Sequence, residues 1–320
     1  MLELLFSNVG ILHAAGFATA FLLTILMIRL FGNKLPRDHG RKFAVEGALS
    51  EGKVRGAGII FVCVFTVVAC VFNVQSTESC AYLLFVLFAM ATGFLDDASD
   101  KPWKDYKKAI FDLLTAVGIT SVMIFENGTT VFFALPGITV EIPVWLYALI
   151  SVGIIWLSIN VTNCTDGVDG LSATLGIVTL GSFIFFDIIM GRSLGQPYVL
   201  GLFCACLMAY LLFNAHPSTV LMGDAGSRAM GTVIAIAALK SRSPFLWIFF
   251  GLVFLLDGGL GLVKLFLGRF LKIKILKNVR TPLHDHVRKN LNWSNTQTVY
   301  RFTIIQTVIS VIVLWLMIWR

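Results

Sequence analysis

The sequence predicts an all-α polytopic membrane protein of about ten transmembrane helices, and three observations support this prediction. The chain is 57% hydrophobic and only 13% charged, whereas about a quarter of the residues in soluble domains are charged. Its mean hydropathy is +0.85. Apolar runs long enough to cross the hydrocarbon core, for which a helix needs about 20 residues, recur along the whole chain. We therefore expect a single membrane domain over residues 1–320.

The expected spans cover residues 8–31, 56–74, 80–95, 109–125, 143–161, 171–189, 198–215, 228–239, 246–265 and 301–319. The eighth is short, and the ninth contains Asp257 followed by two glycines, which predicts a kink. Because an acid inside a helix bundle needs a polar partner, we expect Lys264 to pair with Asp257 in a structural or peripheral role. Between the fourth and fifth spans, two β-prone runs separated by Pro136-Gly137 predict a short external β-hairpin.

The basic residues predict how the spans are oriented. Most of the chain's 25 Lys and Arg lie in three loops, residues 32–55, 96–108 and 266–300. Because successive spans cross the membrane in opposite directions, these three loops lie on the same side of it. Cytoplasmic loops carry the excess of Lys and Arg in membrane proteins. We therefore expect these loops in the cytoplasm and both chain termini outside. The net charge of +7 has the same origin, so it does not indicate a nucleic-acid partner.

The cysteines and the N-terminal region indicate no further chemistry. Five of the six cysteines lie in or beside apolar runs without metal-ligand spacing, and we interpret them as small apolar side chains. Cys164 lies in an acid-bearing stretch, but nothing nearby supplies a base to activate its thiol, so we do not expect a nucleophile. The first apolar run follows Glu3 and lacks a basic segment before it, so we expect no cleavable signal peptide.

Acidic residues recur at the expected cytoplasmic ends of the spans. A charged side chain at membrane depth costs a few kcal/mol or more, so such acids are candidates for a functional site. Four stretches carry them, namely GFLDDASD (93–100), NCTDGVDGLS (163–172), LMGDAGS (221–227) and TPLHDH (281–286). We expect all four stretches to meet at one face of the membrane.

The first and third stretches predict a site for magnesium and phosphate. Asp96 and Asp97 are adjacent, and neighbouring acids repel each other unless a divalent cation or a cationic side chain lies close by. The lysines that follow at 101, 104, 107 and 108 suit bound phosphates, although membrane orientation alone also explains them. Mg²⁺ is usually held by one or two carboxylates together with phosphates and waters. Asp224, which stands among glycines, is the expected ligand.

The second and fourth stretches add further polar groups. Asp166 and Asp169 lie with glycines beside the expected start of a helix, where backbone amides bind phosphate. Acids also cap helices, but capping accounts more readily for one acid than for two. His284 and His286 flank Asp285. This alternation is not specific for zinc, but histidine donates hydrogen bonds to phosphate and carries protons.

The series LDD, NCTDGVDGL, FNAHPSTVLMGDAGS and TPLHDH, in this order across ten spans, resembles the polyprenyl-phosphate N-acetylhexosamine-1-phosphate transferase superfamily. The resemblance covers nearly the whole chain. The last two stretches are more similar to the phospho-N-acetylmuramoyl-pentapeptide transferase branch than to relatives that transfer N-acetylglucosamine phosphate. The chain departs from the family pattern at Asp285, where a histidine triplet has its middle residue. It departs again at Val54, where proline is usual, and at Leu221, where an aromatic that stacks on uracil is common.

The resemblance implies a multi-pass enzyme of the bacterial inner membrane whose active site faces the cytoplasm. The implied reaction is Mg²⁺-dependent transfer of phospho-MurNAc-pentapeptide from UDP-MurNAc-pentapeptide to undecaprenyl phosphate. It yields lipid I and UMP and is the first membrane step of peptidoglycan synthesis. A homodimer is also expected from the family.

The resemblance also implies roles for individual residues. Asp96 would ready the lipid phosphate with the assistance of Asp97, and Asp224 would bind Mg²⁺ in a catalytic role. The residues implied to contact phosphates or the attacking group are Lys104, His284 and His286. Those implied to shape the nucleotide side are Asn163, Asp166, Asp169 and Asn214.

Two other functions are compatible with the same stretches. One is the sibling reaction, which transfers N-acetylglucosamine phosphate from UDP-N-acetylglucosamine to undecaprenyl phosphate. The other is an ion-coupled transporter that uses the carboxylates as proton or cation sites. A transporter predicts acids near the middle of spans, whereas these acids lie at the ends.

Overall fold

The structure is a computed structural model that describes residues 9–38, 40, 50–73, 76–99, 101 and 103–319. It is built almost entirely of helices, and each expected span corresponds to helical structure. The helices are α1 (Val9–Phe31), α2 (Gly58–Phe72), α3 (Thr77–Asp97), α4 (Asp105–Asn127), α5 (Val144–Thr165), α6 (Leu171–Ile189), α7 (Gly195–Asn214), α8 (Gly223–Lys240), α9 (Trp247–Phe250), α10 (Leu252–Phe254), α11 (Leu260–Phe270), α12 (Leu283–Asn290) and α13 (Asn295–Ile318). Short 3-10 helices at Gly32–Lys34 and Pro244–Leu246 and a π-helix at Leu255–Gly259 complete the helical elements.

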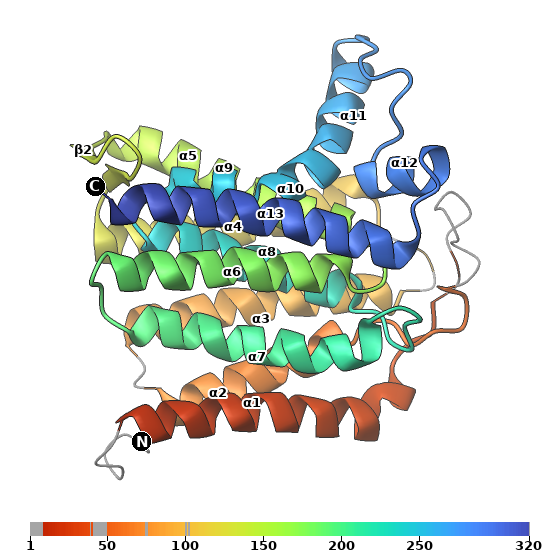
Figure 1. Ribbon diagram of the computed structural model, residues 1–320, viewed down its shortest axis with the longest axis horizontal. Coiled ribbons are helices and arrows are strands. Elements are labelled where there is room, and N and C mark those ends of the chain that lie inside the picture. The colour runs from red at the N-terminus through yellow and green to blue at the C-terminus, as the bar shows by residue number, and fades with distance from the viewer. Residues whose placement is uncertain are drawn as a thin grey trace.

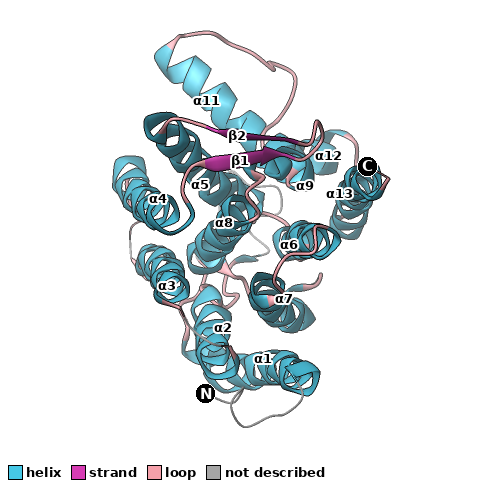
Figure 2. Cartoon of the chain, turned by 90° about the vertical axis from the view of Figure 1, so that its left-hand side faces the viewer, coloured by secondary structure: helices cyan, strands magenta, loops and turns pink. Residues whose placement is uncertain are grey.

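The long helices lie side by side around a central helix, α8 (Figures 1 and 2). From Gly223 to Leu239, every residue of α8 except Ile236 is buried. Seven helices are long and apolar enough to cross a membrane, and an eighth crossing results if the bent pair from Pro244 to Phe270 counts as one span. This supports a polytopic all-α membrane protein. The expected number of ten depends in addition on α2, which has only 15 residues, and on α8. Because α8 is surrounded by protein, its polar residues do not face lipid.

Glycines allow α2 and α3 to pack directly against the start of α8. A Cβ atom on Gly58 would lie 2.0 Å from the backbone nitrogen of Gly226, and one on Gly93 would lie 2.3 Å from the carbonyl oxygen of Asp224. Small residues at helix contacts let the backbones of membrane helices approach each other closely. These contacts fix the position of Asp224 relative to the end of α3, which carries Asp96 and Asp97.

The ninth span is bent, as its sequence predicts. Its two parts, Pro244–Phe250 and Leu252–Phe270, meet at 73°, and α11 projects away from the bundle (Figure 1). The expected pair of Asp257 and Lys264 is wrong. The Lys264 ammonium donates to the carbonyl oxygens of Leu276 and Val279 at 3.1 and 2.8 Å, because the chain after α11 folds back along it. Asp257 instead bonds a histidine of α12, as described below.

The predicted hairpin between the fourth and fifth spans is present. Strands β1 (Thr130–Phe133) and β2 (Ile138–Glu141) pair antiparallel, with Thr130 opposite Glu141. The hairpin lies at the end of the bundle where α1 begins and α13 ends, on the left of Figure 1. The ends of α3, α5 and α7 and the starts of α4, α6 and α8 lie at the opposite end. The acid-bearing stretches therefore lie at one end of the molecule. The start of α1 and the end of α13 lie at the other end.

Candidate active site

The four acid-bearing stretches meet in the structure. The backbone amide of Ala225 donates to Asp97 at 3.0 Å, which joins the third stretch to the first. The side-chain amide of Asn163 donates to the Ser227 hydroxyl at 2.9 Å, which joins the second to the third. A Cβ atom on Gly167 would lie 2.4 Å from the ring nitrogen Nε2 of His284, so the second stretch also touches the fourth. The convergence predicted from the sequence is confirmed.

Two cations link the carboxylates at the centre of this site. Arg55 donates to Asp38 and Asp97, each at 2.8 Å, and lies 3.4 Å from Asp224. Lys108 contacts Asp96 and lies 3.1 Å from the second carboxylate oxygen of Asp224. The backbone amide of Trp103 donates to the other oxygen of Asp96 at 2.7 Å. These six side chains, of Asp38, Arg55, Asp96, Asp97, Lys108 and Asp224, form what we call the acid cluster.

Backbone pairing ahead of α2 and α8 aligns the acid cluster. The amide of Leu221 donates to the carbonyl of Val54 at 2.7 Å, and the amide of Gly58 donates to that of Met222 at 3.0 Å. The turn into α8 requires a positive φ of 68° at Gly223, where a Cβ atom would lie 2.3 Å from a carboxylate oxygen of Asp97. Only glycine combines that conformation with that approach. Val54, at a position where the family usually has proline, therefore contributes through its backbone carbonyl.

The acid cluster carries more negative than positive charge, with four carboxylates facing two cations. Burial lowers the pKa of Arg55, but the carboxylates of Asp97 and Asp224 and the hydrogen bonds to Asp38 and Asp97 raise it by more, so its pKa lies above the ordinary value. Surplus carboxylate oxygens are the hard ligands that Mg²⁺ prefers. Among the described residues, no group of three or more His, Cys, Asp or Glu could hold a metal. A metal bound here would need phosphates and waters as its other ligands, and Mg²⁺ with Asp224 as its ligand stays a prediction.

A second buried ion pair supports the acid cluster. Arg228, one turn after Asp224 on α8, donates to Asp112 on α4 at 2.6 Å and to the carbonyl of Lys108 at 3.2 Å. Arg228 is 3% exposed and Asp112 is 5% exposed. The side-chain amide of Asn160 lies 3.4 Å from the second oxygen of Asp112. Because Arg228 bonds the backbone of Lys108 itself, the pair fixes α4 against α8 at the position where Lys108 meets Asp224.

His284 is held by Asp257. One carboxylate oxygen of Asp257 accepts from the His284 backbone amide at 2.7 Å, and the other lies 2.8 Å from its ring nitrogen Nδ1. Both residues are buried, with Asp257 at 0% and His284 at 3% exposure. A carboxylate on Nδ1 favours the tautomer that carries its proton there and fixes the ring plane, which leaves Nε2 facing the second stretch. His286 differs, since it is partly exposed and its Nδ1 accepts from the backbone amide of Arg280 at 3.3 Å.

Asp169 organises the loop between α7 and α8. Its oxygens accept from the hydroxyl and the amide of Ser218 at 2.7 and 3.0 Å. Lys53 and the ring of His216 lie 3.4 and 3.1 Å from it. Burial raises the pKa of Asp169, but the hydrogen bonds from Ser218 and the neighbouring Lys53 and His216 lower it by more, so its pKa lies below the ordinary value. In this structure Asp169 binds protein groups of its own chain, and its predicted contact with nucleotide is untested.

Asn214 and Asn163 also make contacts within the protein. The Asn214 side chain accepts from the amide of Gly170 at 2.8 Å and donates to the carbonyl of Val220 at 2.9 Å, so it joins α7 to the start of α6. Asn163 lies closer to the acid cluster, because its amide neighbours Asp224 as well as Ser227. Asp166 is partly exposed at the C-terminal end of α5. The nucleotide roles of these residues remain predictions.

The lysine singled out from the sequence does not join the acid cluster. Lys104 is exposed at the N-cap of α4, and its ammonium lies 6.0 Å from the ring centre of Tyr106. Lys108, one helical turn later, makes the contacts expected of a phosphate-binding lysine near the acids. Sequence reasoning also missed the parts played by Arg55, Asp112 and Arg228. The contact of Asp257 with His284 did have a signal in the sequence. Asp257 lies inside an apolar span, and an acid inside the membrane is a candidate for a functional site.

Comparisons with known proteins identify a family that this chain resembles along most of its length. The family model described as glycosyl transferase family 4 matches residues 79–242, which include the first three acid-bearing stretches. The chain is 40% identical over 298 residues to the phospho-N-acetylmuramoyl-pentapeptide-transferase of Treponema pallidum (strain Nichols), which covers 87% of this chain and 81% of that protein. A protein of the same name from Thermotoga petrophila is 28% identical over 307 residues, 94% of this chain and 97% of that protein. Another from Oceanobacillus iheyensis is 27% identical over 307 residues, 89% of this chain and 92% of that protein.

Proposed function

Because the chain belongs to the phospho-N-acetylmuramoyl-pentapeptide transferase family, we propose that it transfers phospho-MurNAc-pentapeptide from UDP-MurNAc-pentapeptide to undecaprenyl phosphate. A phosphate oxygen of the lipid attacks the sugar-linked phosphorus and forms a new P–O bond. The P–O bond to the uridine phosphate breaks, and UMP leaves with its electron pair. The products are lipid I and UMP, so the reaction belongs to peptidoglycan synthesis.

The charges of the acid cluster carry this proposal. A lipid phosphate and a nucleotide diphosphate repel each other, so phosphoryl transfer depends on positioning and neutralising them for in-line attack. Arg55 and Lys108 are the cations placed to do this, since each already bridges two acids of different stretches. Incoming phosphates replace carboxylates around the two cations, and the freed carboxylates become available to a divalent ion.

Within the acid cluster, the two adjacent acids of α3 have different surroundings. Both oxygens of Asp97 are bonded, to Arg55 and to the amide of Ala225, and its side chain is 0% exposed, so it positions Arg55 and the start of α8. Asp96 bonds the ammonium of Lys108, whose side chain is 29% exposed, and the backbone amide of Trp103. We assign Asp96 the role of preparing the lipid phosphate for its attack on the sugar-linked phosphorus. That phosphate is largely ionised at neutral pH, so a strong base is unnecessary.

His284 and the metal complete the proposed chemistry. Its Nε2, held in place through Asp257, faces the loop of Asp166 and Asp169. With the ring proton on Nδ1 this nitrogen accepts a proton, and once it carries that proton it donates a hydrogen bond to a phosphate oxygen. Mg²⁺, when bound by Asp224, supplies further neutralisation of the pyrophosphate.

The position of the site favours an enzyme over an ion-coupled transporter. The carboxylates gather at the ends of helices, whereas a transporter carries its ion sites near the middle of the membrane. The loops rich in Lys and Arg belong to this end, so we place the site at the cytoplasmic face of the bacterial inner membrane. A homodimer is proposed from the family alone.

Product analysis tests the proposed donor. Purified protein in detergent is incubated with undecaprenyl phosphate, Mg²⁺ and either UDP-MurNAc-pentapeptide or UDP-N-acetylglucosamine, and lipid products are identified by mass spectrometry. We expect lipid I with the muramoyl donor and no product with the other. A product from UDP-N-acetylglucosamine alone would assign the chain to the sibling reaction and overturn the proposal.

A further inference from the structure

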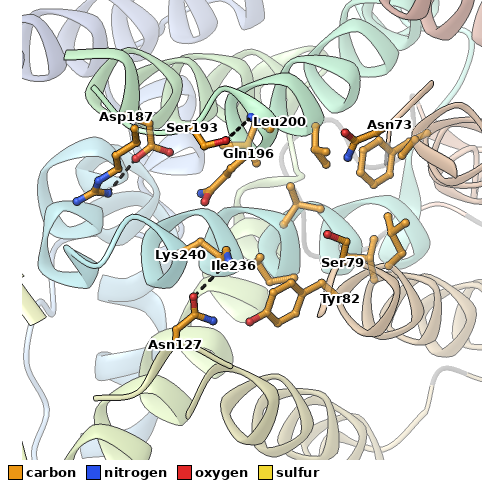
Figure 3. A pocket seen from close by; sticks show the side chains of 18 of the residues that line it. Asn73, Ser79, Tyr82, Asn127, Asp187, Ser193, Gln196, Leu200, Ile236 and Lys240 are labelled. Atoms are coloured by element: carbon orange, nitrogen blue, oxygen red, sulfur yellow. Dashed lines mark hydrogen bonds and ion pairs between the residues drawn. The ribbon is translucent and has the colours of Figure 1, made fainter. Parts of the chain in front are cut away.

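A cavity of about 410 Å³ lies at the end of the bundle remote from the acid cluster (Figure 3). Side chains of α2, α3, α7 and α8 line it. The central helix α8 connects the two sites, since Asp224 is its second residue and Lys240, its last, lines the cavity. No residue of the acid cluster contributes to the lining. The reaction proposed above therefore leaves this cavity without a role.

Lys and Arg side chains, which are few in the connections at this end of the molecule, lie at the rim of the cavity. The connections 73–76, 127–143, 190–194 and 240–246 contain three Lys or Arg between them, Arg192, Lys240 and Arg242. All three line this one cavity. Membrane orientation places Lys and Arg preferentially at the opposite end. Orientation therefore does not explain why the three cations of these connections lie together.

Part of this positive charge has no compensating carboxylate among the described residues. Lys240 bonds both oxygens of Glu78, at 2.7 and 2.9 Å, and Arg192 bonds Asp187 at 2.9 Å. The guanidinium of Arg242 forms no hydrogen bond or ion pair within the part of the chain that the structure describes. Arg242 is exposed and has a φ of 48°, a conformation that L-residues other than glycine rarely adopt. The turn after α8 thus presents an unpaired cation at the rim.

The interior of the cavity is apolar. Phe65 and Ala69 of α2, Val86 of α3, Leu200 of α7 and Val233 of α8 line it, and all are at most 5% exposed in the folded chain. Figure 3 shows the polar side chains of Asn73, Ser79, Gln196 and Lys240 around the same space. A small soluble anion gains nothing from hydrocarbon walls, whereas an acyl chain is stabilised by contact with them. The cationic rim and the apolar interior together match an amphiphile with an anionic head.

We propose that this cavity binds the phosphate head group of an anionic phospholipid from the adjacent membrane leaflet. Arg242 and Arg192 attract the phosphate, Lys240 completes the positive rim, and an acyl chain lies against Phe65, Ala69 and Val86. Lipid phosphates are attracted to Lys and Arg near the membrane surface, with a contribution of about 1 kcal/mol per cation. The proposal does not rest on the transfer reaction.

Native mass spectrometry of the full-length protein in detergent tests this proposal. Phosphatidylglycerol and phosphatidylcholine are titrated separately, and inorganic phosphate is added as a competitor. Arg242→Gln removes the exposed cation without breaking an ion pair. Lys274→Gln is the matched control, because Lys274 is an exposed cation in the loop after α11. Ala69→Phe fills the apolar interior.

We expect phosphatidylglycerol to bind at least fivefold more tightly than phosphatidylcholine, and Arg242→Gln to reduce that preference about fivefold. Lys274→Gln keeps the preference, and Ala69→Phe weakens the binding of both lipids. Equal affinity for the two lipids, or an unchanged preference in Arg242→Gln, would overturn the assignment of the head group. Displacement by millimolar inorganic phosphate, or unchanged binding in Ala69→Phe, would show that no acyl chain is recognised.

Discussion

The ammonium nitrogen of Lys108 lies 3.1 Å from a carboxylate oxygen of Asp224. The two residues belong to α4 and α8, and Lys108 also contacts Asp96 at the end of α3. One lysine therefore joins the acid predicted to ready the lipid phosphate to the acid predicted to bind Mg²⁺. A phosphate entering between these acids meets a cation that is already in position, which is the condition for electrostatic catalysis.

Replacement of Lys108 by Gln is expected to lower kcat for UMP release by about 100-fold or more, because one preorganised donor to a developing charge is typically worth that much. Lys104→Gln is the matched control, since Lys104 carries the same charge one turn earlier and is exposed. We expect it to change kcat less than about threefold. A larger loss in Lys104→Gln than in Lys108→Gln would assign the phosphate-binding role to Lys104.

Asp257 is expected to act through His284. Asp257→Asn removes the carboxylate charge beside Nδ1 and leaves one acceptor oxygen where the backbone amide and the ring of His284 now use two. It should therefore lower kcat at least about tenfold and alter the pH profile of kcat. His284→Gln should lower kcat as well, and the double variant should be no worse than His284→Gln alone. Residues that act as a unit show this non-additivity. Losses that multiply in the double variant would mean that the two residues act independently.

The buried pair of Arg228 and Asp112 yields a prediction on stability. Arg228→Met leaves the Asp112 carboxylate buried without its cation, which is expected to reduce the free energy of unfolding by about 3–5 kcal/mol. The double variant Arg228→Met/Asp112→Leu should recover most of this loss, because apolar groups of similar volume replace buried pairs at little cost. Thermal unfolding in detergent measures both. An unstable double variant beside a stable Arg228→Met would contradict the assignment.

Asp169 predicts a pH dependence of stability. Its pKa in the folded protein lies below the ordinary value of 3.8. The ionised carboxylate therefore stabilises the fold fully above about pH 4, and this contribution is lost as the pH falls through the folded-state pKa. The thermal midpoint of Asp169→Asn should lie below that of the natural protein at pH 7, with a difference that shrinks below about pH 4. Asp105→Asn, at a carboxylate with 88% side-chain exposure, should show no such difference. A pH-independent difference for Asp169→Asn would contradict this account.

The sequence predicted the helical spans and three of the four acids of the acid cluster, Asp96, Asp97 and Asp224, because apolar runs and acids at their ends are local signals. The side-chain contacts between different helices could not be predicted from the sequence. Whether Lys104 or Lys108 faces the acids depends on where α4 begins, at Asp105, and on its rotation against α3 and α8. Lys264 was the nearer partner for Asp257 along the chain, but the 73° bend separates α11 from the bundle and brings α12 against Asp257 instead.

The part played by Arg55 was also not predicted from the sequence, for a related reason. In the sequence it is one of many basic residues in a cytoplasmic loop, and positive-inside orientation explains such a residue fully. Its contacts with Asp38, Asp97 and Asp224 arise only because the segments before α2 and α8 pair through their backbones. Tertiary contacts of this kind leave no periodic pattern in the chain.

If the acid cluster catalyses transfer from UDP-MurNAc-pentapeptide, UMP release by the purified protein is the most direct test of it. Initial rates with undecaprenyl phosphate and Mg²⁺ are compared for the natural protein, Asp96→Asn and Asp224→Asn, with thermal unfolding as the check on folding. We expect release that stops on chelation and falls at least about 100-fold in both variants. Full release by folded Asp96→Asn and Asp224→Asn, or none by the natural protein, would contradict this role of the acid cluster.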